Sequence, residues 1–342
     1  MKRFSRQFFL ILCAILSISL ITQLFALASG SSDSETSAGE HVITSQAAIV
    51  IDFDTGLVIF EHNADELRVP ASMAKMVAAH VVFDAIRDGA VSLDTLIDIS
   101  DDVSEFSYVR AFSNVPLPVQ SSFSVRDLLY VVIVRSASAA TIALGEGIFG
   151  SEEAMVAKMN EKALQLGISA EFFDSWGGSP DNRISARGMA DMTRALIKEY
   201  PEILEFTSKA NVTFDDIPYR NTNMLIAEYE GVDGFKTGFT NPAGWCFTAT
   251  ALQKGRRIIS VTMGSVQGYR FSDSVILLDH GFLNYNVVIA NHFKSAVKSS
   301  VPMPPLNTTL VPLKMYNIYE ARYIGLRDLA LILNEVTENK KD

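Results

Sequence analysis

The sequence predicts a mixed α/β (α+β) domain in which an antiparallel sheet is flanked by helices and joined to a mainly helical subdomain. Three observations predict it: a strand pair opens the segment, a long helical block follows, and three strand patterns with a last helix close it. Strands on both sides of a helical block can complete one antiparallel sheet. With 342 residues, 48% of them hydrophobic, the chain can bury a core of this size.

The first element is a β-hairpin. An apolar segment, residues 47–53, runs into Asp54-Thr55-Gly56, and a second run follows at residues 57–61. Two such runs around a short turn are typical of paired strands. Apolar side chains then recur at mostly helical spacing over residues 71–86, which predicts a buried helix that begins near Ser72.

The middle of the chain is predicted to be helical. We expect helices over residues 124–149, 151–166 and 185–200, because a serine opens each one. Gly167 and Pro201 follow the second and third helices and are typical stop signals.

Strand patterns return near the end of this domain. Residues 234–240, 244–252 and 257–264 are rich in aromatic and β-branched side chains, and Lys254-Gly255 supplies the turn between the last two. A final helix over residues 272–283 would pack behind these strands.

The N-terminal residues 1–28 read as a secretory signal peptide, with a basic start, an apolar run and the small-residue ending Ala26-Leu27-Ala28. An uncleaved membrane anchor is the alternative, and polar residues that interrupt the run argue against it. Cleavage would leave Cys246 as the one cysteine, so no intrachain disulfide is expected. Lipid modification of Cys13 is disfavoured because Leu12 precedes it.

The predicted domain order continues with a polar spacer at 29–40, a catalytic domain at 41–292, a proline-rich linker at 293–314 and a short segment at 315–342. Within the last segment, residues 323–333 fit an interfacial anchor less well than a docking helix. Membrane or wall attachment therefore stays open.

Charge and motif content exclude several classes of protein. The net charge is −10, which argues against nucleic acid as a partner. The five histidines lack the spacing of metal ligands, and no glycine-rich phosphate loop follows a strand. We therefore expect neither a metal nor a cofactor.

Three short motifs supply the groups that acyl transfer needs: Ser72-Met73-Ala74-Lys75, Ser136-Ala137-Ser138 and Lys236-Thr237-Gly238. Residues three apart share a helix face, so the Lys75 amine would lie one turn from the Ser72 hydroxyl. Burial and the nearby Lys236 cation would lower the pKa of Lys75, so that it can act as a base.

A Ser-x-x-Lys motif alone is a weak signal, and a second copy occurs at residues 295–298. The surroundings of Ser72, however, resemble the D-Ala-D-Ala carboxypeptidases among the low-molecular-mass penicillin-binding proteins, over about residues 47–285. The matching stretches are Asp54-Thr55-Gly56, Pro70-Ala71-Ser72-Met73-Ala74-Lys75, Met159-Asn160-Glu161-Lys162-Ala163, Asn221-Thr222-Asn223-Met224-Leu225, Gly231–Thr240 and Arg270.

The resemblance implies a β-lactamase/transpeptidase-like fold, a place in the cell envelope, peptidoglycan stem peptides as substrate and β-lactams as covalent inhibitors. It implies that Ser72 forms the acyl-enzyme, that Lys75 takes its proton and that Ser136 relays a proton to the leaving D-alanine. The substrate would be held by Lys236, Thr237, Gly238 and Ser138. The backbone N–H groups of Ser72 and Phe239 would form the oxyanion hole, and Arg270 would bind the terminal carboxylate, with a surface salt bridge as its alternative.

Two departures from the family pattern leave alternatives open. Ser138 stands where the family usually has asparagine, which admits a catalytically weak or inactive binding module. Residues 173–178 follow the family pattern only loosely, so substrate preference near this loop is open. A secreted β-lactamase shares the three motifs, with Glu161 as its candidate glutamate, although an exposed helix carboxylate explains Glu161 better.

Overall fold

The computed structural model describes residues 43–300, and of residues 287, 289–291 and 293–300 only the backbone. The predicted signal peptide, the spacer, the linker beyond residue 300 and the segment 315–342 lie outside the described residues. A division of the chain into two units falls after Asn291, and the description below concerns the first unit. Within the described residues no helix is both long enough and apolar enough to span a membrane.

A five-stranded antiparallel sheet lies at the centre of this unit, in the order β2-β1-β11-β10-β9. Its strands are β1 (Ala47–Asp52), β2 (Val58–His62), β9 (Val232–Thr240), β10 (Gly244–Gln253) and β11 (Arg256–Ser265). The N-terminal hairpin thus pairs with the last strand along the chain, as the sequence predicts. β9 forms one edge of the sheet.

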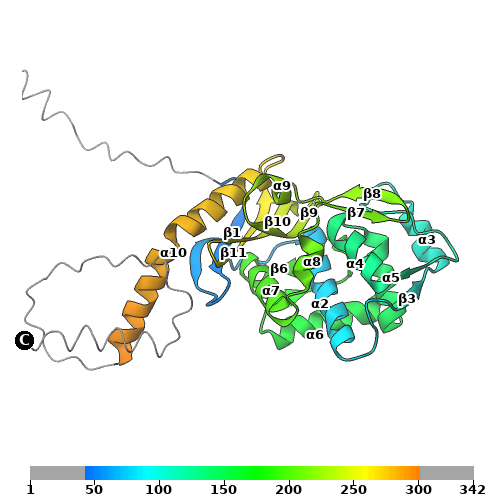
Figure 1. Ribbon diagram of the computed structural model, residues 1–342, viewed down its shortest axis with the longest axis horizontal. Helices are drawn as coiled ribbons and strands as arrows, with labels where there is room; N and C mark the ends of the chain where they lie inside the picture. Colours follow the sequence, from blue (N-terminus) through cyan, green and yellow to red (C-terminus); the bar gives the residue numbers. More distant parts are fainter. Residues whose placement is uncertain (1–42, 301–342) are drawn as a thin grey trace, which may run out of the picture. The chain divides into compact units, whose positions relative to one another are not determined.

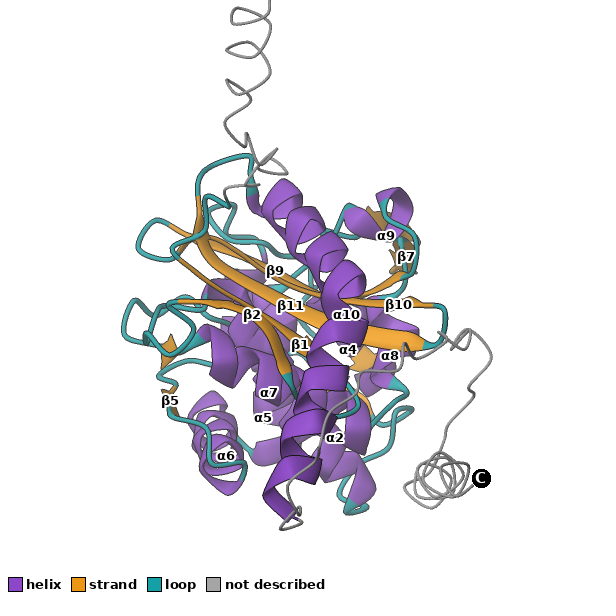
Figure 2. Cartoon of the chain, turned by 90° about the vertical axis from the view of Figure 1, so that its left-hand side faces the viewer, coloured by secondary structure: helices purple, strands orange, loops and turns teal. Residues whose placement is uncertain are grey.

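The two faces of the sheet are buried under different helices (Figure 2). In β1, Ile49 and Ile51 point into the larger core, which includes helices α2 (Ala74–Arg87) and α7 (Ala186–Glu199). Val50 points into a smaller core with Leu277 and Leu278 of helix α10 (Arg270–Ser300). Successive side chains of a strand face opposite sides, so every residue of β1 is buried. This double burial explains why the strand reads as a continuous apolar run.

The helical subdomain lies beyond one face of the sheet (Figure 1). Its elements are the 3-10 helix η1 (Ala71–Met73), α2 (Ala74–Arg87), α3 (Asp101–Ser107), α4 (Val125–Val134), α5 (Ser138–Phe149), α6 (Glu152–Gln165), α7 (Ala186–Glu199) and α8 (Ile203–Thr207). The side chains of Ser124, Ser151 and Ser185 cap α4, α6 and α7, as the sequence predicts. α2 is buried along most of its length, which places its first turn deep in the molecule.

The remaining elements are short apart from one long helix. They are the two-stranded antiparallel pairs β3 (Leu96–Asp98) with β4 (Ser122–Ser124), β5 (Ala170–Glu171) with β6 (Arg183–Ile184) and β7 (Asn211–Phe214) with β8 (Ile217–Arg220), the helix α9 (Leu225–Glu228) and the long α10 (Arg270–Ser300).

Two predicted helix boundaries are wrong. The helix expected over residues 124–149 is two helices, because Ser136 takes a left-handed φ of 66° that no α-helix accommodates. The last helix continues to Ser300 instead of ending near residue 283, so the first residues of the predicted linker are helical. The remaining strands and helices named in the sequence analysis form within a few residues of the predicted positions.

Candidate active site

Ser72 lies at the junction of η1 and α2, on a backbone that two unusual residues shape. Ala71 has a left-handed φ of 49°, which is rare for a residue with a side chain. Gly177, from a distant loop, packs on this turn: a Cβ at Gly177 would lie 2.0 Å from the Ala71 carbonyl oxygen and 2.9 Å from the Ser72 nitrogen. The loop thus fixes the turn from outside and requires glycine there.

Lys75 points back from the first turn of α2 to Ser72. Its Nζ donates to Ser72 Oγ at 2.9 Å and to the backbone oxygen of Trp176 at 2.6 Å. The side chain is fully buried, with 0% exposure, and no carboxylate lies in ion-pair contact with it among the described residues. A buried amine with a hydroxyl and a carbonyl as its partners can lose its proton far more easily than one paired with a carboxylate.

Burial lowers the pKa of Lys75 to about 7, and the negative charges of Asp174 and Glu152 limit the fall. Lys236, 1% exposed, has its pKa lowered well below the usual value, first by burial and then by repulsion from Lys75 and Arg270. We expected both burial and the Lys236 charge to lower the pKa of Lys75. Burial is the main cause of the lowered pKa of Lys75, whereas the repulsion between the two lysines lowers the pKa of Lys236.

Ser136 and Ser138 lie where the predicted helix breaks between α4 and α5. Both are buried, at 4% and 2% exposure. The Ser138 N–H donates to the Ser113 carbonyl at 2.9 Å, and the Asn114 side chain accepts from the Ala139 N–H at 2.8 Å. The loop before α4 therefore holds the start of α5 in place.

The third motif lies on β9, the edge strand of the sheet. A Cβ at Gly238 would lie 2.8 Å from the Pro70 carbonyl oxygen and 3.2 Å from the Ser72 nitrogen, so this strand crosses directly over the Ser72 turn. The Thr237 hydroxyl donates to the Thr222 hydroxyl at 2.8 Å, and Lys236 Nζ donates to the Thr237 carbonyl at 3.1 Å. An edge strand keeps backbone groups free to pair with an extended peptide.

Phe239 and Arg270 lie at the outer end of the same strand. The Phe239 side chain is 47% exposed, and the centre of its ring lies 4.5 Å from the centre of the Trp245 ring. The Arg270 guanidinium lies over the same Trp245 ring, 4.7 Å from its centre. Arg270 forms no ion pair among the described residues, so the surface salt bridge considered as its alternative is absent there. Burial lowers the pKa of Arg270 to about 10.

The loop after β5 is organised around one carboxylate. Asp174 accepts from the Gly177 N–H at 2.6 Å, from the Ser179 N–H and from the Asn182 side chain at 3.0 Å. These bonds present the Trp176 carbonyl to Lys75. The loosely matching stretch 173–178 is thus an ordered part of the site.

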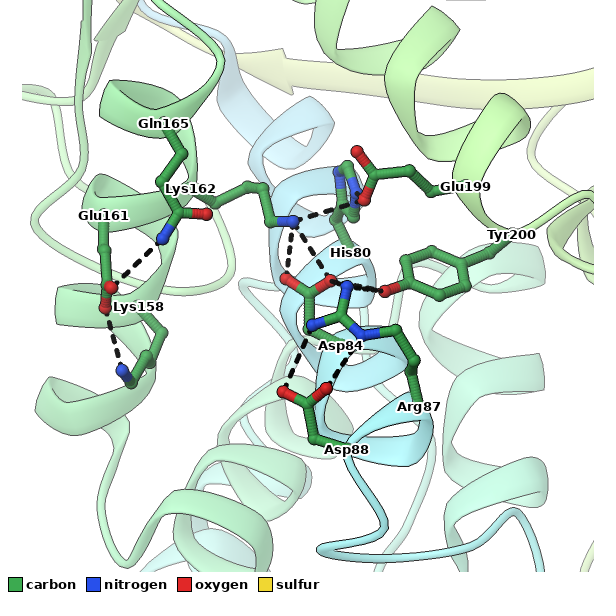
Figure 3. A network of polar contacts seen from close by, with 10 residues as sticks. All are labelled: His80, Asp84, Arg87, Asp88, Lys158, Glu161, Lys162, Gln165, Glu199 and Tyr200. Carbon is green, nitrogen blue, oxygen red and sulfur yellow. Dashed lines mark hydrogen bonds and ion pairs between the residues drawn. The ribbon is translucent and has the colours of Figure 1, made fainter.

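A second polar cluster surrounds the middle and end of α2 (Figure 3). Lys162 Nζ lies 2.7 Å from Asp84 and 3.3 Å from Glu199, and Glu199 lies 3.0 Å from the fully buried His80. The ligand atoms of His80, Asp84 and Glu199 come within 4.8 Å of one another, which is close enough for a metal ion. The Lys162 ammonium already occupies the position of the cation.

Glu161 lies outside this second cluster, on the exposed face of α6. It pairs with Lys158 at 2.8 Å, and its side chain is 51% exposed. The interpretation of Glu161 as an ordinary helix carboxylate fits this position.

The structure brings Ser72 and Lys75 into direct contact, and β9, which carries Lys236 and Thr237, crosses the Ser72 turn at Gly238. It holds Ser136 and Ser138 at a buried helix junction and leaves Phe239 and Arg270 at the open end of β9. Sequence reasoning missed the carbonyl of Trp176, the cap from Asn114 and the hydroxyl of Thr222. Only Gly177-Gly178 gave a signal, because paired glycines often mark a close backbone approach.

Comparison with known proteins matches this chain over residues 34–267 to the family model described as D-alanyl-D-alanine carboxypeptidase. The chain belongs to this family. It is 31% identical over 287 residues to the D-alanyl-D-alanine carboxypeptidase DacF of Bacillus subtilis, a match that covers 80% of this chain and 70% of the relative.

Solved structures of penicillin-binding proteins share the fold. The peptidoglycan synthesis regulatory factor PBP3 of Streptococcus pneumoniae is 32% identical, with a TM-score of 0.67 over 70% of this chain and 73% of that one. Penicillin-binding protein D2 of Listeria monocytogenes, in its ampicillin-bound form, is 31% identical, with a TM-score of 0.63 over 70% of this chain and 98% of that one. The predicted β-lactamase/transpeptidase-like fold is confirmed.

Family membership makes the protein a serine-type D-Ala-D-Ala carboxypeptidase, a hydrolase that acts in peptidoglycan metabolism. Its relatives act on the cell wall, in agreement with a place in the envelope. The matched family and relatives are carboxypeptidases and penicillin-binding proteins, so neither the β-lactamase nor the non-catalytic alternative is favoured.

Proposed function

We propose that this carboxypeptidase removes the terminal D-alanine of stem pentapeptides through an acyl-enzyme on Ser72. The observation that carries the proposal is the fully buried Lys75 amine, 2.9 Å from Ser72 Oγ, with a pKa of about 7. A base with a pKa near the working pH is best suited to take the proton of a nucleophile.

In the first step the Ser72 proton moves to Lys75 while Oγ bonds to the carbonyl carbon of the penultimate D-alanine. The backbone N–H groups of Ser72 and Phe239 receive the oxyanion, each such donor lowering the barrier by about 3 kcal/mol. The C–N bond then breaks as Ser136 relays the proton: its hydroxyl proton passes to the amine of the departing D-alanine and is replaced by the proton that Lys75 took from Ser72. Water next cleaves the ester and restores Ser72, so that the net reaction consumes one water.

The substrate is held along the edge of β9. Lys236, Thr237 and Gly238 line the strand that crosses the Ser72 turn, and Arg270 lies at its open end with no carboxylate partner among the described residues. A half-buried cation that has aromatic rings but no carboxylate as its neighbours among the described residues suits the terminal carboxylate of the substrate. Ser138 offers one hydroxyl where the family usually has an amide, so we expect slower turnover than in a relative that carries asparagine.

We also propose that residues 41–292 are the catalytic domain of a secreted protein that β-lactams acylate. The basic, apolar and small-residue pattern of residues 1–28 supports export. A relative of known structure is described in its ampicillin-bound form, which supports β-lactam binding. N-terminal sequencing tests the cleavage of residues 1–28, and cell fractionation tests attachment to the membrane or wall through residues 315–342.

The experiment is intact-mass spectrometry of the mature protein with benzylpenicillin, followed by D-alanine release from diacetyl-Lys-D-Ala-D-Ala. We expect a penicilloyl adduct and D-alanine release in the wild type and neither in Ser72→Ala. Ser138→Asn restores the residue usual in the family and should release D-alanine faster than the wild type, which tests the alternative of a catalytically weak binding module. A stable adduct without D-alanine release in the wild type would support that alternative, and rapid penicillin hydrolysis would support a β-lactamase.

A further inference from the structure

Two aromatic rings flank Arg270, the first residue of α10, at the open end of β9. The guanidinium carbon lies 4.7 Å from the centre of the Trp245 ring and 4.7 Å from the centre of the Phe271 ring, and these two rings are here called the ring pair. Trp245 lies on β10, where it is paired in register with Phe239 of β9. The ring pair therefore connects the strand of the third motif with the start of α10.

The ring pair is anchored in the core on one side and reaches the surface on the other. The centre of the Phe271 ring lies 5.2 Å, edge to face, from that of Phe247, whose side chain is fully buried. The centre of the Trp245 ring lies 4.5 Å from that of Phe239, which is half exposed and belongs to the strand that crosses the Ser72 turn. The guanidinium between these rings is thus held beside the site.

Within the described residues, rings take the place that a carboxylate would usually have beside a half-buried arginine. The nearest carboxylate along the chain, that of Asp273, accepts instead from the Thr44 N–H at 3.0 Å and from the Thr44 hydroxyl at 2.8 Å. The pKa of Arg270, lowered by burial to about 10, keeps the guanidinium charged at neutral pH, and this charge helps to lower the pKa of Lys236. An aromatic ring attracts a guanidinium without neutralising it, so its charge and its N–H groups remain available to a ligand.

A guanidinium binds a carboxylate most strongly through two parallel hydrogen bonds, which require a defined orientation of its plane. We propose that Trp245 is a positioning residue, which together with Phe271 orients Arg270 for the free carboxylate of the terminal D-alanine and so sets a preference for substrates with a free C-terminus. The inference rests on the proposed function and on the role given there to Arg270. A carboxylate in place of the ring pair would also hold the guanidinium, but it would compete with the substrate.

The test measures kcat and KM for two peptides that differ only at the C-terminus. These are diacetyl-Lys-D-Ala-D-Ala, which releases D-alanine, and its C-terminal amide, which releases D-alaninamide. Active enzyme is titrated with benzylpenicillin, so that unfolded protein does not enter the values. In the wild type we expect kcat/KM for the carboxylate peptide to exceed that for the amide at least about tenfold, because only the carboxylate forms charge-assisted hydrogen bonds with Arg270.

Variants at Trp245 separate positioning of the arginine from a general effect on the site. Trp245→Leu should lower kcat/KM for the carboxylate peptide about fivefold to tenfold, chiefly through KM, and change the amide less than about twofold. Trp245→Phe keeps a ring and should stay within about twofold of the wild type on both peptides. In an Arg270→Gln background, Trp245→Leu should cost less than about twofold, because the group that Trp245 positions is gone. Leu252→Ala, at a 45% exposed position near the other end of β10, is the control and should leave all values unchanged.

The outcomes distinguish the inference from the proposed function. An equal loss on both peptides in Trp245→Leu means that Trp245 acts through Phe239 and the oxyanion hole, and it overturns the inference. An undiminished loss in the Arg270→Gln background, or equal efficiency of the wild type on the two peptides, also overturns it. Each of these results leaves the acyl-enzyme on Ser72 standing. Failure of the wild type to release D-alanine from the carboxylate peptide overturns the proposed function, and the inference with it.

Discussion

Two buried lysines lie against opposite ends of α2, and their surroundings differ. Lys75, on the first turn, is 0% exposed and contacts a hydroxyl and a carbonyl. Lys162, which reaches α2 from α6, is 7% exposed and contacts two carboxylates, those of Asp84 and Glu199 (Figure 3). Burial is similar, so the partners decide what each amine does.

The comparison separates a reactive lysine from a structural one. A carboxylate partner compensates the cost of burying an ammonium group and keeps its proton in place. Neutral partners compensate less of the cost of burying an ammonium group. The amine therefore loses its proton near neutral pH, because the uncharged form avoids this cost. The protein thus retains a less stable arrangement at Lys75, where a proton acceptor is useful.

The largest effect is expected when Lys75 is replaced by methionine. Lys75→Met removes the base but keeps the side-chain volume, so the rate of acylation by benzylpenicillin should fall about 10³-fold. The melting temperature should change little, because removing the cost of burying the amine offsets the loss of its hydrogen bonds to Ser72 and to the Trp176 carbonyl. Stopped-flow acylation and thermal unfolding check both parts. Loss of folding, or an acylation rate within tenfold of the wild type, would contradict the role of Lys75.

The second prediction concerns the other lysine. Lys162→Met leaves the carboxylates of Asp84 and Glu199 without their buried partner and should lower the free energy of unfolding by about 3 kcal/mol. Acylation of the folded fraction should remain within about twofold of the wild type. Lys158→Met, which breaks the exposed pair with Glu161 on the same helix, is the control and should cost no more than about 0.5 kcal/mol. Urea unfolding measures both.

The sequence alone could not show most of the difference between the surroundings of Lys75 and those of Lys162. The three motifs gave Ser72, Lys75 and Lys236 because spacing along a helix or a strand is local information. The carboxylate partners of Lys162 come from α2 and α7, at sequence separations of 78 and 37 residues. Only the packing of three helices brings these groups together, so the network had no signature in the sequence.

Backbone conformation was a second limit on prediction. The apolar run over residues 124–149 has the pattern of one helix, and nothing in Arg135-Ser136-Ala137 announces a break. The left-handed φ of Ser136 costs about 1–3 kcal/mol, which the surrounding contacts must supply. Ala71, beside Ser72, shows the same feature. The strained backbone at Ser136 and next to Ser72 is a case in which local preference is overruled at a functional site.

The third prediction is a pH profile set by Lys75. Acylation requires neutral Lys75, so its rate should level off above a midpoint near pH 7 and fall about tenfold per pH unit below it. Between pH 7 and 10.5 the folded protein binds fewer protons at Lys75 than the unfolded chain, so this group makes stability rise with pH by about 1.4 kcal/mol per unit. The free energy of unfolding in urea is measured against pH for the wild type and for Lys75→Met, and the difference between the two proteins should rise with this slope. If the difference does not change with pH, a group other than Lys75 causes the fall of the acylation rate at low pH.

The smallest effect tests the carboxylates that act on Lys75 from a distance. Asp174 raises the pKa of Lys75 without touching it, so Asp174→Asn should lower that pKa and move the midpoint of the acylation profile down by about half a pH unit. Asp181→Asn, at an exposed position of the same loop, should leave the midpoint in place. An upward shift in Asp174→Asn, with an unchanged melting temperature, would mean that the hydrogen bonds of Asp174 to the loop matter more than its charge. Lys75 would then owe its low pKa to the burial that this loop maintains, because the Trp176 carbonyl, as an acceptor from Lys75 Nζ, favours the ammonium form.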